Sequence, residues 1–149
     1  MNGRPADANL SIATVKIRPE GASRECTAVI VARKLLFTAG HCLQGVTSQV
    51  VKMTAYNDLS GRQRHILRVM QWKTPPKYTN SDTKEPEDIQ YDFAFLRTRE
   101  DLITEFGLTE SQIPKVATGL DDLKSLLAKN STTLAYGYGH FSKNKTGEK

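Results

Sequence analysis

The sequence predicts an all-β protein, and three observations support this prediction. Apolar and polar residues alternate in short runs through the first hundred residues, which is typical of strands with one buried face. The runs are rich in Val, Ile, Phe and Thr, and turn-forming residues separate them. Such short strands in close succession favour a β-barrel or a β-sandwich.

Six strands are expected in order along the chain. In the first, Ala13, Val15 and Ile17 point to one face, and the polar residues between them point to the other. The remaining strands are predicted at residues 26–32, 34–38, 49–56, 64–72 and 92–98. Their apolar faces would together supply one core.

The rest of the chain is less regular. Residues 73–91 are polar and rich in proline, which predicts a long loop. Residues 121–130 predict a short helix with Asp121 as its N-cap. Its apolar side would consist of Leu123, Leu126 and Leu127. Residues 132–138 predict a last strand before a polar tail.

Composition narrows the class of protein. The chain has 149 residues, 38% hydrophobic and 25% charged, and no apolar run near the ~20 residues of a membrane helix. The net charge of +5 is spread along the sequence rather than clustered. Nucleic-acid binding is therefore not expected, because it favours a basic stripe.

The most informative motif surrounds one histidine. Thr38-Ala39-Gly40-His41-Cys42 follows an apolar run. Taken alone, such a histidine reads as a half-buried imidazole bonded to the backbone. The motif, however, closely resembles the Thr-Ala-(Ala/Gly)-His-Cys signature around the catalytic histidine of trypsin-like serine proteases. The resemblance implies a double β-barrel and a Ser-His-Asp triad.

The two cysteines, Cys26 and Cys42, extend this resemblance. Composition alone leaves a disulfide and two unrelated thiols open. The family has a disulfide at this spacing that closes the histidine loop, so the resemblance implies a Cys26–Cys42 bridge. A zinc site built from these residues with His41, His65 or His140 is not expected, because the usual metal-ligand spacings are absent. No cofactor is expected.

A second motif, Tyr91-Asp92-Phe93-Ala94-Phe95-Leu96, opens the sixth predicted strand. Alone, Asp92 could be an ordinary strand-edge aspartate. The segment resembles the Asp-(Ile/Phe)-Ala-x-Leu segment of the same family. The resemblance implies that Asp92 orients His41, and that His41 acts as the general base.

The resemblance also implies a domain division. Residues 1–108 would form the first barrel, and residues 109–149 would begin the second. Tyr138 replaces the tryptophan of the family's Gly-Trp-Gly strand, and residues 141–149 fall where the family has its exposed autolysis loop. The start aligns with the mature family N-terminus but lacks its leading isoleucine. No apolar signal segment follows Met1, so a signal has been removed or is not included.

None of the serines lies in a sequence like Gly-Asp-Ser-Gly-Gly. We therefore expect this chain to be one part of a secreted or periplasmic serine endopeptidase and to be inactive alone. Either the sequence is truncated, or a separate C-terminal chain carries the serine. Its substrate would be a protein or peptide, with no nucleic-acid or membrane partner. Two alternatives stay open: a non-catalytic protease homologue that acts as a binding module, and a basic barrel that binds polyanions.

Overall fold

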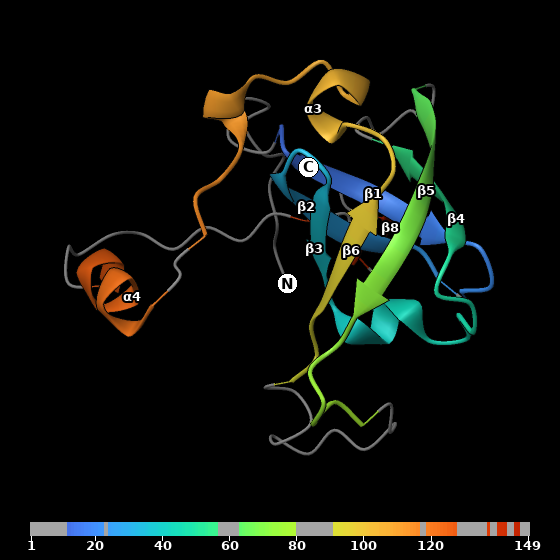
Figure 1. Ribbon diagram of the computed structural model, residues 1–149, viewed down its shortest axis with the longest axis horizontal. Helices are drawn as coiled ribbons and strands as arrows, with labels where there is room; N and C mark the ends of the chain where they lie inside the picture. The colour runs from blue at the N-terminus through green and yellow to red at the C-terminus, as the bar shows by residue number, and fades with distance from the viewer. Residues whose placement is uncertain are drawn as a thin grey trace.

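A computed structural model describes residues 12–22, 24–56, 63–79, 91–116, 119–127, 137, 140–142 and 145–146. Six antiparallel strands close into a barrel in the order β1-β2-β3-β6-β5-β4 (Figure 1). Their bounds are β1 Thr14–Pro19, β2 Cys26–Ala32, β3 Leu35–Thr38, β4 Val51–Tyr56, β5 Arg64–Lys73 and β6 Ala94–Thr98. The protein is therefore all-β and built around a closed barrel, as predicted.

The alternation in the sequence becomes the inside and outside of this barrel. In β4, Val51, Met53 and Ala55 are buried, while Lys52 between them is exposed. The other strands follow the same period, because successive side chains of a strand point to opposite faces. The fully buried side chains of the barrel interior include Val15, Ile17, Ile30, Leu36, Met53, Leu67, Val69 and Leu96.

One strand boundary differs in an informative way. The sixth strand was expected to begin at Asp92, but β6 begins at Ala94. The backbone N–H of Phe93 donates to the carbonyl of Tyr91 at 2.8 Å, so the chain turns there before it enters the sheet. This turn leaves Asp92 outside the strand ladder.

Short helical turns follow β3 and β6, and the sequence pattern did not predict them. They are η1 (Gly40–Leu43), α3 (Leu102–Glu105) and η2 (Glu110–Gln112). The side chain of Asp101 caps α3 by accepting hydrogen bonds from two backbone N–H groups. Leu102 and Ile103 are buried in the barrel core. These turns are too short to show a helical period.

The predicted helix forms as α4 (Leu120–Leu127) and stands apart from the barrel (Figure 1). The prediction of Asp121 as N-cap is wrong: the helix begins one residue earlier, and Asp121 lies in its first turn, where a carboxylate faces the positive end of the helix dipole. The apolar side predicted for this helix, and all but Gly137 of the predicted last strand, lie outside the described residues.

Beyond α4, two short strands pair in the segment predicted to be a polar tail. They are β7 (His140–Ser142) and β8 (Lys145–Thr146), and they run antiparallel. In the part of the chain that the structure describes, no helix is long and apolar enough to cross a membrane.

Candidate active site

Strand pairing brings the two predicted site residues together. Thr38 at the end of β3 pairs with Ala94 at the start of β6. His41 lies three residues after Thr38, and Asp92 lies two residues before Ala94. Because the strands are antiparallel, both residues leave the sheet at the same end of the barrel. The pairing of β3 with β6 therefore makes neighbours of His41 and Asp92, which lie 51 positions apart in the sequence.

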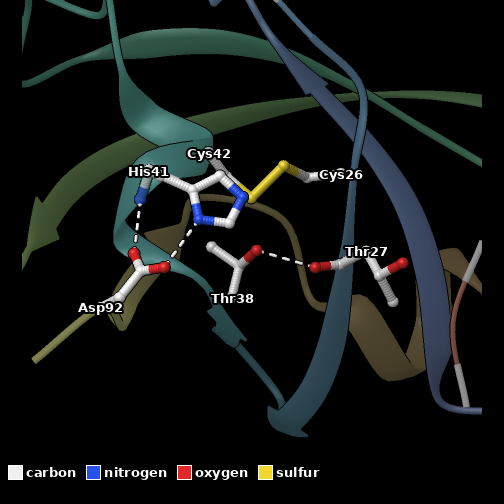
Figure 2. Close-up of a disulfide and its surroundings, with 6 residues drawn as sticks. All are labelled: Cys26, Thr27, Thr38, His41, Cys42 and Asp92. Atoms are coloured by element: carbon white, nitrogen blue, oxygen red, sulfur yellow. Dashed lines mark hydrogen bonds and ion pairs between the residues drawn. A yellow bond between two sulfur atoms is a disulfide. The ribbon is translucent and has the colours of Figure 1, made fainter. Parts of the chain in front are cut away.

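Asp92 holds His41 by two hydrogen bonds (Figure 2). Its Oδ1 accepts the backbone N–H of His41 at 2.8 Å, and its Oδ2 lies 2.7 Å from the ring Nδ1. Since an ionised carboxylate only accepts hydrogen bonds, Nδ1 carries the proton. In the neutral ring, Nε2 is then the nitrogen with a free lone pair. The carboxylate thus fixes both the position and the tautomer of the imidazole.

A disulfide fastens the turn that carries His41. Cys26 at the start of β2 and Cys42 in η1 are joined, with their Cα atoms 5.9 Å apart. The implied bridge is therefore present. Beside it, the buried hydroxyl of Thr38 donates to the carbonyl of Thr27 at 2.7 Å (Figure 2). The bridge and this bond both tie the His41 segment to β2.

Tyr78 is a site neighbour that the sequence did not reveal. A Cβ added to Gly40 would lie 3.0 Å from the Tyr78 ring and 3.2 Å from Oδ1 of Asp92. Glycine at position 40 therefore leaves room for a tyrosine and a carboxylate to pack against the histidine turn. Burial, and secondly the negative charge of Asp92, raise the pKa of Tyr78. The residue lies in a proline-rich loop, where periodicity gives no signal.

The residues weighed as zinc ligands are arranged differently. The ligand atoms of Cys26, His41 and Cys42 lie within 4.8 Å of one another, but both sulfurs are engaged in the disulfide. His65 lies on β5 instead, where its Nδ1 is 3.0 Å from a carboxylate oxygen of Glu105. The side chain of His140 lies outside the described residues.

Comparison with known proteins identifies the family of the chain. The family model described as Trypsin matches residues 1–149. The chain belongs to the trypsin family. The closed barrel and the disulfide described above agree with this family. No curated protein matches the chain.

A solved structure agrees with the trypsin-family fold. Neuropsin, a serine protease expressed in the limbic system of mouse brain, superposes with a TM-score of 0.50 at 20% sequence identity. The match covers 78% of this chain and 47% of the neuropsin chain. The trypsin-family chain studied here thus spans about half the length of that protease.

Proposed function

We propose that this chain supplies the acid–base half of a trypsin-like serine endopeptidase, with His41 as general base and Asp92 as its positioning partner. The observation that carries the proposal is the pair of hydrogen bonds that Asp92 accepts from the backbone and the ring of His41. This arrangement orients an imidazole for proton transfer and stabilises the imidazolium that forms.

The exposure of the ring supports a role in chemistry. The side chain of His41 is 46% exposed, whereas that of Asp92 is 26% exposed. A hydroxyl from another segment can therefore reach Nε2. In the proposed reaction, Nε2 takes the serine proton as the serine oxygen attacks the peptide carbonyl. It then returns this proton to the departing amine.

The serine must come from outside these 149 residues, because none of them forms the family's nucleophile motif. We propose that residues 1–108 are the first barrel, that residues 109–149 begin the second, and that a C-terminal segment or separate chain completes it. The core supports a boundary near this point: among the described residues its buried members end at Leu108, and only the partly buried Ile113 packs against it from beyond. On this proposal the chain alone is inactive.

The proposed substrate is a peptide bond in a protein, and the proposed location is secreted or periplasmic. The disulfide supports this location, because such bridges persist in oxidising compartments. The proposed chemistry requires no metal or cofactor.

A fluorophosphonate probe tests the proposal on the native protein, purified with whatever polypeptide accompanies this chain. We expect the probe to label a serine outside the present sequence, and intact-mass analysis to identify the polypeptide that carries it. His41→Gln should abolish labelling. Since His65 also bonds a carboxylate but lies on β5, His65→Gln is the matched control and should retain labelling.

Two results would contradict the proposal. A folded native protein that the probe does not label would favour a non-catalytic binding module. Equal labelling of the His41→Gln variant and the unmodified protein would exclude His41 as the base.

A further inference from the structure

The outer surface of β1, β4 and β5 carries an unusual concentration of positive charge. Arg18, Lys52, Arg64 and Arg68 are all exposed and all point away from the barrel core. We call this surface the basic face. The charges are scattered in the sequence, but β1 pairs with β4 and β4 with β5, which brings their outward faces together. Figure 1 shows these three strands side by side.

The arrangement of these charges does not serve the stability of the sheet. Lys52 and Arg68 are direct cross-strand partners, and like charges in such positions repel. Arg18 pairs with Thr54, two residues from Lys52, which makes the two cations diagonal neighbours. The fold gives no reason for gathering cations here.

Neighbouring acidic side chains neutralise little of the positive charge of the basic face. Lys16, at its margin, forms an ion pair with Glu25. Glu100 accepts the backbone N–H of Arg68, and the backbone N–H of Glu20 donates to the carbonyl of Lys52. Within the described ranges, Arg18, Lys52, Arg64 and Arg68 form no ion pair with an acidic side chain.

Apolar side chains are interleaved with these charges. On β5, the outward residues in order are Arg64, Ile66, Arg68 and Met70. Ile66 is 41% exposed and Met70 is 46% exposed. Val50, which is 56% exposed, directly precedes β4 at the end where Val51 pairs with Val69. The face therefore offers both charge and apolar contact.

We propose that the basic face is a docking surface for an extended acidic peptide segment of a protein partner, with apolar residues among its carboxylates. The alternation of cations and apolar side chains on β5 favours such a peptide over a sulfated polysaccharide or a nucleic acid, which would leave Ile66 and Met70 without partners. The barrel is closed, so the peptide binds through side chains rather than as an added strand.

This surface is separate from the His41–Asp92 pair. That pair leaves the sheet beside β3 and β6, whereas the basic face lies on β1, β4 and β5. The proposal therefore does not depend on the catalytic role of His41, and a binding measurement tests it without any protease activity.

Fluorescence anisotropy of the full 149-residue chain tests the proposal. The probe is a short labelled peptide in which glutamates are interspersed with leucines. We expect Lys52→Glu combined with Arg68→Glu to weaken binding about tenfold or more, since each lost attraction becomes a repulsion. Ile66→Ser should weaken it roughly threefold, because it removes apolar contact.

Lys34→Glu is the matched control, because Lys34 lies in the exposed turn between β2 and β3. It reverses one charge outside the basic face, as Lys52→Glu alone does within it. Lys34→Glu should leave binding within about twofold, whereas Lys52→Glu alone should weaken it more. Circular dichroism establishes that each variant is folded.

Three outcomes would overturn the proposal. The first is an equal loss of binding from Lys34→Glu, which would show that only net charge matters. The second is equally tight binding of a peptide with serine at every leucine position, together with competition by heparin, which would indicate a polyanion site. The third is no binding of the acidic peptide to the unmodified chain.

Discussion

Asp92 contacts His41 at two points, the backbone N–H and the ring Nδ1, through its two separate carboxylate oxygens. The backbone bond fixes where the histidine segment lies, and the ring bond fixes how the imidazole is turned. The two functions depend on one side chain, so they are lost together when it is removed.

Asp92→Asn should keep the fold and remove the correct tautomer. An amide can donate to Nδ1, which would place the ring proton on Nε2 and remove the base. In the complete enzyme we expect kcat to fall about 10⁴-fold, as when a triad aspartate is amidated. Nitrogen NMR of the imidazole should show the exchanged tautomer. Unchanged kcat would contradict the proposed role of Asp92.

Substitutions at Gly40 should report on the space shared with Tyr78 and Asp92. In Gly40→Ala the Cβ is tight against both, and a small shift of the tyrosine ring should limit the cost to about 1 kcal/mol. Gly40→Val should cost about 1–3 kcal/mol in urea unfolding. Adding Tyr78→Ala to Gly40→Val should recover part of this loss. Additive losses would show that the tyrosine does not limit the space.

Removal of the disulfide should lower stability without opening the barrel. Cys26→Ser combined with Cys42→Ser frees a loop with a sequence separation of 16 residues. We expect a loss of about 3 kcal/mol in the free energy of unfolding, from the larger entropy of the unfolded chain. Reduction of the unmodified protein should give a similar loss. A loss of less than about 1 kcal/mol in the free energy of unfolding would contradict this entropic contribution of the bridge.

Two neighbouring residues of β5 provide a test of the barrel register. Leu67 is fully buried, whereas Ile66 is 41% exposed on the opposite face. Leu67→Ala should cost about 2–5 kcal/mol, because it leaves a cavity. Ile66→Ala should cost about 0.5 kcal/mol or less, as most exposed substitutions do. Thermal unfolding of both variants is the measurement, and reversed or equal losses would contradict the register.

Alkaline pH should destabilise the protein partly through Tyr78. Burial and then the charge of Asp92 raise the pKa of this tyrosine, so the folded state keeps the phenolic proton after the unfolded state has lost it. Stability is therefore unaffected by this group below about pH 10 and falls as the pH rises further. Tyr78→Phe should make the decline of stability with pH less steep.

Asp92→Asn provides a check on the cause of this shift. The substitution removes the negative charge near Tyr78 but leaves the tyrosine buried. The pKa of Tyr78 should therefore fall only part of the way toward its ordinary value. Ultraviolet titration of tyrosinate, compared with the Tyr78→Phe variant, isolates this group. A pKa of Tyr78 unaffected by the substitution would show that the Asp92 charge is not felt there.

Sequence alternation predicted the barrel strands well, because burial of one face imposes a period of two on every strand. The spacing of apolar residues predicted both ends of β2 correctly and the ends of β5 to within one residue. The meeting of His41 and Asp92 followed from motif resemblance rather than from periodicity. Their contact depends on the pairing of β3 with β6, which no local pattern encodes.

Features that arise only in three dimensions escaped prediction. Tyr78 approaches Gly40 from a loop, and the turn at Tyr91 that frees Asp92 from β6 depends on a single backbone hydrogen bond. The helix boundary at Leu120 was missed by one residue, because aspartate suits both a cap and a first turn. The basic face was invisible in the sequence because its cations come from three strands.

The position of β6 in the barrel has a consequence for folding. It is the last of the six barrel strands in sequence, yet it lies between β3 and β5 in the ring. The carboxylate of Asp92, two residues before this strand, reaches the imidazole of His41 through the pairing of β3 with β6. A spectroscopic signal from that bonded ring proton would therefore report when β3 and β6 pair during folding.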